Sequence, residues 1–287
     1  MTDTAANRAS RRRASRVDVT LVLGLIMLGL IVLISVLGPI LSDPSLANVG
    51  AVRPRRPPGA DFWLGTDAQG RDMLTLMLNA TPNTLKMGLI AGVIGVGFGT
   101  LVGLIAGQFG GWIDSVISVI SDALMTVPAI AILVIIAGNI EEMTALIMAL
   151  VVASLSWMFT ARTVRAQVLT VKERGYVEVA RVNGMAPLEI LFVEVMPNVA
   201  PYILASFVGT VSAAILATIG LEALGLGAQN EMTLGNTIYW AQQSSAVLRG
   251  FWWWWGPPIV VIAVIFVGLF LTSVGFDRFA NPRLGRD

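Results

Sequence analysis

Residues 87–113 read MGLIAGVIGVGFGTLVGLIAGQFGGWI and contain no Asp, Glu, Lys or Arg. This stretch is longer than the roughly 20 apolar residues that a helix needs to cross a hydrocarbon core about 30 Å thick. Its glycines Gly95, Gly99, Gly103 and Gly107 recur at every fourth position, so they share one face of the predicted helix. Small side chains on one face let a second helix approach closely in a membrane. We therefore expect a membrane span packed tightly inside one subunit, with a subunit interface or a pore lining as the alternative.

Five further stretches lack acidic and basic residues over a comparable length. They are Val19–Ile40, Ala123–Ile140, Met143–Ala161, Val195–Leu221 and Phe251–Phe276. Apolar residues make up 55% of the 287 residues, charged residues only 13%, and the mean hydropathy is +0.77, which excludes an ordinary soluble domain. Continuous apolar runs also exclude a membrane barrel, because barrel strands alternate apolar and polar residues. The predicted fold class is an all-α polytopic membrane protein with six transmembrane helices.

The positions of the 19 Lys and Arg residues indicate how the spans are oriented. Five precede the first span, five lie in the loop 162–194 and three follow the sixth span. Because cytoplasmic loops are enriched in Lys and Arg, both termini and this loop are predicted to be cytoplasmic. The exception is the cluster Arg53–Arg56, which falls in a predicted external loop. The net charge of about +1 gives no reason to expect a nucleic-acid partner.

The chain is therefore divided into four parts. We predict a disordered cytoplasmic tail (1–16), a first transmembrane helix (17–40), an external loop (41–86) and a core with five further spans (87–287). The basic start followed by an apolar run is similar to a signal peptide. The run is too long for one, and no small-residue cleavage pattern follows, so we interpret it as a signal anchor.

Residue types that are missing exclude several kinds of chemistry. The chain has no Cys and no His, which removes thiol nucleophiles, Ser-His-Asp triads and histidine metal sites. Its two lysines, Lys86 and Lys172, are followed by Met and Glu, whereas a phosphate-binding P-loop needs Lys before Ser or Thr. We therefore predict no catalytic residue, no metal site and no cofactor in this chain, and no enzyme activity of its own.

Asp122 and the four tryptophans Trp252, Trp253, Trp254 and Trp255 are further candidates for a functional role. An ionisable group inside a span is a functional candidate by default, although at the inner interface water would remove the cost of its charge. Tryptophans gather at membrane interfaces, so an aromatic belt that anchors the sixth span is the simpler interpretation. The alternative is that these rings stack on a sugar or peptide at the outer mouth.

The predicted cytoplasmic loop contains the sequence EVARVNG at 178–184. The surrounding residues favour a helix from Lys172 to about Leu188. In such a helix Ala180 and Gly184, four apart, would form a small face, while Glu178 and Arg181, three apart, could pair on another side. A short helix of this kind can enter a groove on a partner protein. From the residues alone, an ordinary surface helix is an equally good interpretation.

This loop resembles the EAA loop of the permeases of binding-protein-dependent ABC importers. That pattern reads Glu-Ala-Ala, three residues, Gly, nine residues, Ile-x-Leu-Pro. Glu178, Ala180, Gly184 and Pro197 stand at the matching offsets, and Pro197 also suits the first turn of the fifth span, where its missing N–H is not needed. The chain departs from the pattern at Val179, Glu194 and Met196.

Other stretches are similar to the dipeptide/oligopeptide type of these permeases, over about residues 17–284. They are LGTDAQGRD at 64–72, GGWID at 110–114, LGLG at 224–227 with LGN at 234–236, and Asp277 with the run NPR at 281–283. The usual Gly-Ala-Arg stretch is replaced by NATP at 79–82.

The resemblance implies six spans with both termini inside, in the second permease of a pair, within a prokaryotic plasma (inner) membrane. It also implies the partners: a homologous permease, two subunits that bind ATP and magnesium, and an extracytoplasmic solute-binding protein. Glu178, Ala180, Arg181 and Gly184 would then belong to a coupling helix on the ATPase. Oligopeptides are the first expected substrate, with oligosaccharides as the alternative because tryptophans and an amide-rich external segment suit sugars. An ion-coupled secondary transporter is the rival from another class, although intramembrane acids are nearly absent.

Overall fold

The computed structural model describes residues 19–280, so the predicted tail 1–16 and the run NPR at 281–283 lie outside the described part. Within it the chain is helical, with a single isolated bridge between Thr66 and Asp72 and no strand. The elements are α2 (Val19–Leu41), η1 (Pro44–Ala47), α3 (Met73–Phe109), α4 (Gly111–Thr126), α5 (Ala129–Gly138), α6 (Ala145–Lys172), α7 (Gly175–Val182), α8 (Pro187–Ile190), the π-helical turn η2 (Leu191–Val195), α9 (Met196–Ala223), α10 (Leu234–Gln243) and α11 (Trp252–Ala280).

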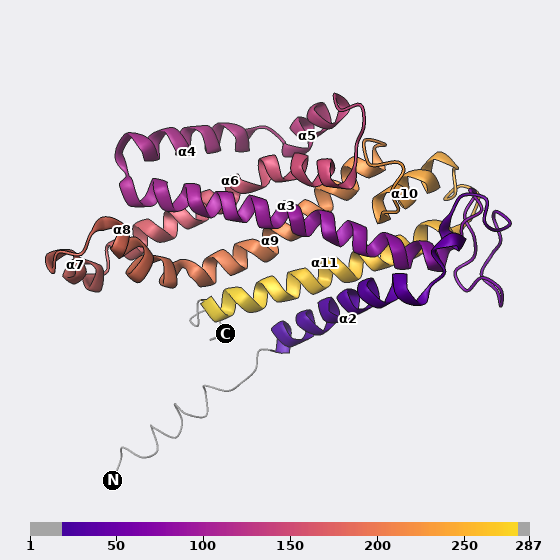
Figure 1. Cartoon of the computed structure of the whole chain (residues 1–287), viewed down its shortest axis with the longest axis horizontal. Coiled ribbons are helices and arrows are strands. Elements are labelled where there is room, and N and C mark those ends of the chain that lie inside the picture. The colour runs from indigo at the N-terminus through magenta and orange to yellow at the C-terminus, as the bar shows by residue number, and fades with distance from the viewer. Residues whose placement is uncertain (1–18, 281–287) are drawn as a thin grey trace, which may run out of the picture.

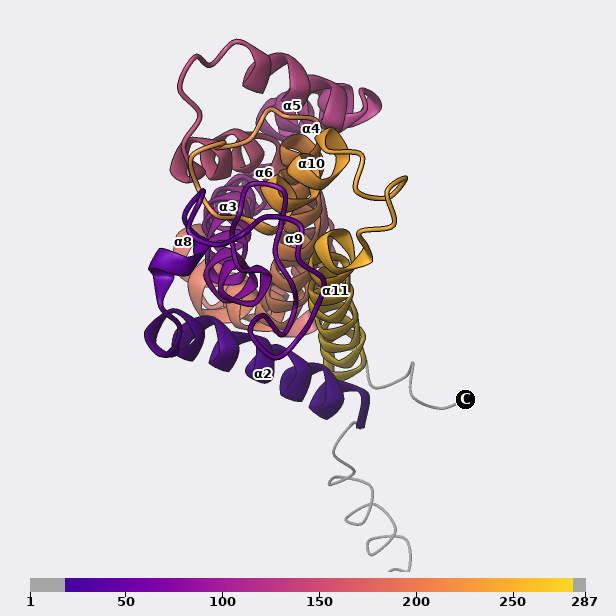
Figure 2. The same ribbon diagram turned by 90° about the vertical axis from the view of Figure 1, so that its right-hand side faces the viewer.

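The long helices α3, α6, α9 and α11 run side by side and form an elongated bundle (Figure 1). The helix α2 covers one side of it, and α4 with α5 covers the opposite side (Figure 2). The short helices α7 and α8 lie at one end, whereas the segment 42–72 and α10 lie at the other (Figure 1). Five helices are long and apolar enough to cross a membrane, and α4 with α5 makes a sixth if that bent pair counts as one span. The predicted fold class is confirmed.

The third predicted span, Ala123–Ile140, is not one continuous helix. The helices α4 and α5 meet at an angle of 83°. Pro128 has no N–H to donate, and its ring pushes the preceding residue out of the α conformation. Val127 accordingly has extended backbone angles, with φ −88° and ψ 133°. The apolar stretch predicted as the third span is therefore divided at this proline into two helices.

The second predicted span is part of a longer helix. The helix α3 begins at Met73 rather than Met87, so residues 73–86, placed in the predicted external loop, are helical. Asp72 caps its start, because the Asp72 carboxylate accepts a hydrogen bond from the Thr75 N–H at 2.9 Å. Lys86 and Pro82 interrupt the apolar run but not the helix. The fourth span likewise runs beyond Ala161, since α6 continues to Lys172.

The glycine face of α3 packs inside this one chain, as expected. A Cβ atom added at any one of Gly95, Gly99, Gly103 and Gly107 would lie closer than 3.0 Å to an atom of α6. The helices α3 and α6 can come this close only because these positions have no side chain, so the glycines set the distance between the two helices. Gly92, one turn earlier, approaches α9 in the same way.

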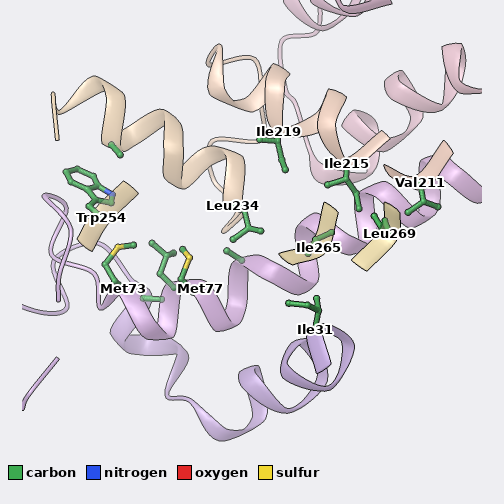
Figure 3. Packing of buried hydrophobic residues seen from close by; sticks show 14 of the residues in the cluster. Ile31, Met73, Met77, Val211, Ile215, Ile219, Leu234, Trp254, Ile265 and Leu269 are labelled. Atoms are coloured by element: carbon green, nitrogen blue, oxygen red, sulfur yellow. The ribbon is translucent and has the colours of Figure 1, made fainter. Parts of the chain in front are cut away.

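The largest apolar core lies towards the end that carries the segment 42–72 and α10 (Figure 3). It joins α2, α3, α9, α10 and α11. Its buried members include Ile31, Met73, Met77, Ile215, Ile219, Leu234, Trp254 and Ile265. Since this core uses every long helix except α6, and the glycine face joins α6 to α3, the bundle forms one packed unit.

Candidate functional site

The helix α7 has one face turned into its own chain. Val177 and Ala180, three residues apart, are 0% and 6% exposed. They belong to a cluster that also takes in α3, α6, α8, η2 and α9, here called the valine cluster. Its buried members are Leu104, Val164, Val168, Val171, Val177, Ala180, Ile190, Leu191, Val195 and Val199. The prediction that Ala180 forms part of an outward small face was wrong, because its methyl group fills this cluster.

The other face of α7 is open. Glu178, Val179 and Arg181 are exposed, and Val182 is 81% exposed. Within residues 19–280 no ion pair joins Glu178 to Arg181, so the predicted pairing is not seen. Two exposed aliphatic side chains, Val179 and Val182, next to one acidic and one basic residue give a small apolar surface with charges along one edge. That is the composition of a protein-binding surface.

Gly184 ends α7 in a Schellman motif rather than forming a face of it. The Met185 N–H reaches the Ala180 carbonyl at 3.2 Å, and the Gly184 N–H reaches the Arg181 carbonyl at 3.1 Å. Gly184 has φ +81°, in the left-handed region where residues with a Cβ are strained. Nothing lies within 4 Å of where its Cβ would be. The backbone angle alone therefore accounts for glycine within this chain.

Pro197 lies at the start of α9, as predicted, but the helix does not begin freely there. The π-turn η2 precedes α9 without a break, and the Met196 N–H bonds to the Leu191 carbonyl. Because Pro197 lacks an N–H and its ring crowds the carbonyl four residues earlier, a regular helix across it would be strained. The wider π-turn absorbs this change. The Asn198 side-chain amide donates a hydrogen bond to the Glu194 carbonyl at 2.7 Å.

Polar side chains fasten this end of the molecule. The Lys172 ammonium donates to the carbonyls of Gly107 and Gln108, at 3.1 and 2.7 Å, and so caps the C-terminus of α3. The Gln108 amide donates to the Pro187 carbonyl at 2.8 Å. These contacts tie α3, α6 and α8 together around α7. None was predicted, because Lys172 and Gln108 are isolated polar residues with no pattern around them.

Asp122 is not enclosed in the bundle. Its side chain is 59% exposed on α4 and pairs with Arg162 of α6 at 3.4 Å. A stronger link lies about two helix turns before it, where Arg165 donates two hydrogen bonds to Asp114, one of them at 2.6 Å. A small cavity of about 210 Å³ is lined by Asp122, Arg162 and Arg165. Asp122 and Asp114 thus attach α4 to α6, and the GGWID motif contains the more important of the two.

The four tryptophans do not share one environment. Trp254 is 1% exposed and belongs to the large core, so its ring is not open to a substrate at an outer mouth, which was the alternative interpretation. Trp252 is exposed, and Trp253 donates its indole N–H to the Thr66 carbonyl at 3.2 Å. Trp253 therefore joins α11 to the segment 42–72, which the sequence alone did not reveal.

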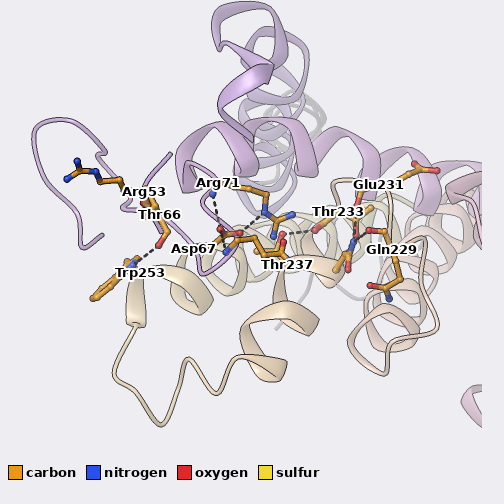
Figure 4. Close-up of polar contacts among 11 residues, drawn as sticks. Arg53, Thr66, Asp67, Arg71, Gln229, Glu231, Thr233, Thr237 and Trp253 are labelled. Atoms are coloured by element: carbon orange, nitrogen blue, oxygen red, sulfur yellow. Dashed lines mark hydrogen bonds and ion pairs between the residues drawn. The ribbon is translucent and has the colours of Figure 1, made fainter. Parts of the chain in front are cut away.

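The LGTDAQGRD stretch builds a turn around a buried charge pair (Figure 4). The Asp67 carboxylate accepts hydrogen bonds from the Gln69 and Arg71 N–H groups at 2.8 and 2.9 Å. The Arg71 guanidinium donates a further hydrogen bond to the same carboxylate, with Nε 2.6 Å from Oδ2. The motif residues Asp67 and Arg71 therefore have structural roles within the described chain.

The glycine motifs at 224–227 and 234–236 surround Glu222, which the sequence analysis did not single out. Gly225 ends α9 in a second Schellman motif, with φ +84°. A Cβ at Gly227 or Gly235 would lie closer than 3.0 Å to the fully buried Glu222 side chain. The two glycines are thus required by the space that this carboxyl group fills.

An all-α bundle with at least five helices long enough to span a lipid bilayer defines a multi-pass membrane protein. A family model of the binding-protein-dependent transport system inner membrane component matches residues 99–286. The chain belongs to this family.

Individual relatives agree with this assignment. The oligopeptide transport system permease protein OppC of Mycobacterium tuberculosis is 34% identical over 185 residues, which is 64% of either chain. The dipeptide transport system permease protein DppC of Alkalihalophilus pseudofirmus is 35% identical over 216 residues, covering 74% of this chain and 69% of the relative. The glutathione transport system permease protein GsiD of Pectobacterium atrosepticum is 34% identical over 179 residues, covering 61% and 58%. The chain thus matches a little under two thirds of the mycobacterial relatives' length.

Proposed function

We propose that this chain is a permease subunit of an ATP-driven, binding-protein-dependent importer, with α7 as the helix that docks on an ATPase subunit. The observation that carries the proposal is the division of α7 into a buried face and an open face. The open face, which carries Val179 and Val182 beside Glu178 and Arg181, suits a groove on a partner protein. Family membership supplies the kind of partner.

The valine cluster explains how docking would act on the rest of the chain. Val177 and Ala180 are enclosed by residues of α6, η2 and α9, so α7 cannot shift far without moving those helices. The Lys172 and Gln108 hydrogen bonds extend the connection to α3. In this proposal the ATPase pair contacts α7 and the corresponding helix of the second permease. If it binds one relative arrangement of these two helices more tightly than another, it shifts the bundle towards that arrangement. ATP and magnesium are held by the partner subunits in this proposal.

Peptides are the proposed substrate class. The relatives reported above are permeases of oligopeptide, dipeptide and glutathione transport systems. The oligosaccharide alternative depended on four tryptophans at an outer mouth, and the burial of Trp254 weakens it. The remaining proposed partners are a homologous permease and a solute-binding protein outside the membrane. The apolar side chains exposed on α4 and α5 offer the second permease a surface.

The coupling role is tested by placing a charge on the open face of α7. Val182→Asp puts a carboxylate into the proposed groove, where an unpaired charge is strongly unfavourable. We expect it to lose co-purification with the candidate ATPases and at least about tenfold of the substrate-stimulated ATP hydrolysis in proteoliposomes.

Val49→Asp is the matched control. Val49 is a similarly exposed valine in the segment at the opposite end of the molecule. It should leave the ATPase complex intact. If Val182→Asp retains both complex formation and stimulated hydrolysis, α7 is not the docking helix. Binding of peptides by the cognate solute-binding protein tests the substrate class separately.

A further inference from the structure

A small polar cavity lies where α4 packs on α6, on one side of the bundle (Figure 2). Its volume is about 210 Å³, and its polar lining consists of Ser118, Ser121, Asp122, Arg162 and Arg165. Pockets that enclose a whole drug-sized ligand usually measure about 300–1,000 Å³. This cavity therefore suits a small charged group rather than a peptide of several residues.

The cavity offers charged groups of both signs. Asp122 and Arg162 pair at 3.4 Å, but their side chains are 59% and 63% exposed, so this contact is weak and both groups can bind a ligand from outside the chain. Arg165 is held by its two hydrogen bonds to Asp114. The charges of these four side chains cancel. An ion of one sign would meet a like charge here, whereas a zwitterion meets a partner for each of its charges.

One hydroxyl at the cavity lacks a partner. Ser121 is 4% exposed, and its hydroxyl makes no hydrogen bond to any residue in the described part of the chain. The neighbouring Ser118 hydroxyl, by contrast, donates to the Asp114 carboxylate at 3.4 Å. A buried hydroxyl without a partner is unfavourable. Because Ser121 lines the cavity, an oxygen atom of a ligand bound there would accept its hydrogen bond.

The cavity lies at the level of a lipid headgroup. The part of α6 that precedes Arg162, residues 145–161, has no charged side chain and is about 26 Å long at 1.5 Å per residue. This length is close to the hydrocarbon core of a bilayer, roughly 30 Å. The acids Glu141 and Glu142 stand just before the other end of the stretch. Arg162 therefore lies where the hydrocarbon ends and the headgroups begin.

Exposed apolar side chains stand one helix turn deeper than the cavity. Met125 follows Asp122 by three residues on α4, and Phe159 precedes Arg162 by three residues on α6, so each shares a helix face with its charged neighbour. The ion pairs between α4 and α6 show that the two helices are antiparallel, so both side chains lie nearer the middle of the apolar stretch. Met125 and Phe159 are 39% and 60% exposed. This arrangement fits an amphiphile with a small polar head.

We propose that the cavity binds the headgroup of a phospholipid with a primary ammonium group, such as phosphatidylethanolamine. The ammonium group contacts Asp122, the phosphate contacts Arg162 and the Ser121 hydroxyl, and the acyl chains lie along Met125 and Phe159. The lipid then bridges α4 and α6 where their direct ion pair is weak. This site rests on the chain being a membrane protein and not on the proposed coupling role of α7.

The proposal is tested by native mass spectrometry of the full chain with phospholipids that share the same acyl chains and differ only in the headgroup. Phosphatidylethanolamine is compared with phosphatidylcholine, whose methylated ammonium has no N–H to donate, and with phosphatidylglycerol, which has no ammonium. We expect phosphatidylethanolamine to bind with an apparent Kd at least about fivefold lower than either, because hydrogen bonds between ionised groups are the strong ones.

Asp122→Asn should remove this preference, and because the Asp122 side chain is largely exposed, the change leaves the packing of α4 intact. Asp61→Asn is the matched control, since Asp61 is also an exposed aspartate that pairs with an arginine. It should keep the preference.

Equal binding of the three lipids by the unmodified chain, or a preference that survives Asp122→Asn, would overturn the proposal. An excess of the dipeptide Ala-Ala, which carries an ammonium and a carboxylate but no acyl chain, is the last comparison. Retention of phosphatidylethanolamine against Ala-Ala supports a lipid site, whereas its displacement would identify a peptide site and refute the assignment to a lipid.

Discussion

The Schellman motif at the end of α7 gives a prediction that separates conformation from contact. Gly184→Val places a β-branched side chain at φ +81°, while Gly184→Asn places a side chain that tolerates this region. Nothing within the chain lies within 4 Å of the new Cβ, so neither variant creates an internal clash. The two variants therefore differ mainly in backbone strain.

The magnitude follows from that strain. A left-handed conformation destabilises an ordinary L-residue by about 1–2 kcal/mol, and Asn by less. The strain is relieved by breaking the bonds from Gly184 and Met185 to the Arg181 and Ala180 carbonyls. A change of this size alters the population of the closed motif by roughly 5- to 30-fold. Val should therefore open the end of α7, and Asn should largely keep it closed.

Hydrogen exchange at the amides of Gly184 and Met185, measured by mass spectrometry on the reconstituted chain, reports this opening directly. We expect faster exchange and weaker stimulated ATP hydrolysis for Gly184→Val than for Gly184→Asn. Gly175→Val is the control, since Gly175 begins α7 with no neighbour within 4 Å and no left-handed φ. If Asn impairs hydrolysis as much as Val while exchange is unchanged, close contact with a partner, and not the backbone angle, requires the glycine.

Other variants test the packing of the bundle. Gly99→Leu should destabilise the chain by about 1–3 kcal/mol through overpacking against α6, whereas Gly97→Leu, with nothing within 4 Å, should leave its thermal unfolding in detergent unchanged; equal effects would refute the role of the glycine face. Asp114→Ala should destabilise by about 2 kcal/mol because Arg165 loses its bidentate partner, and Arg165→Ala in the same chain should add little; additive losses in urea unfolding would argue against a coupled pair. Lys172→Met should speed hydrogen exchange in the last turn of α3, and unchanged exchange there would exclude the cap.

The fold class could be predicted because burial in lipid leaves a long, continuous signal. The glycines of α3 were also interpretable, since spacing by four has one geometric meaning. The ends of the helices were harder to predict. Met73–Lys86 mixes apolar and polar residues because it lies in a protein core rather than in lipid, so hydropathy alone assigned it to a loop. Pro128 was visible in the sequence, but whether a proline kinks a helix or breaks it depends on packing.

In the candidate site, too, some features could be predicted from the sequence and others could not. The position of α7 and the importance of Gly184 followed from the loop pattern, whereas the inward direction of Ala180 did not. A small residue in a short helix suits either face, and only its neighbours on α6 and α9 decide. The pair Asp114–Arg165 joins two different helices, α4 and α6, so no periodic pattern in the sequence indicates it. Glu222 was missed because a single acid at a helix end is ordinarily a surface residue.

The two faces of α7 also bear on engineering. Residues of the open face, such as Val179 and Val182, are mostly exposed to solvent, so they can be exchanged between related proteins one at a time. Val177 and Ala180 interlock with α6 and α9 and must be transplanted together with those neighbours. A chimera that swaps the whole helix should misfold locally, whereas one that swaps only its outer residues should change which ATPase it accepts.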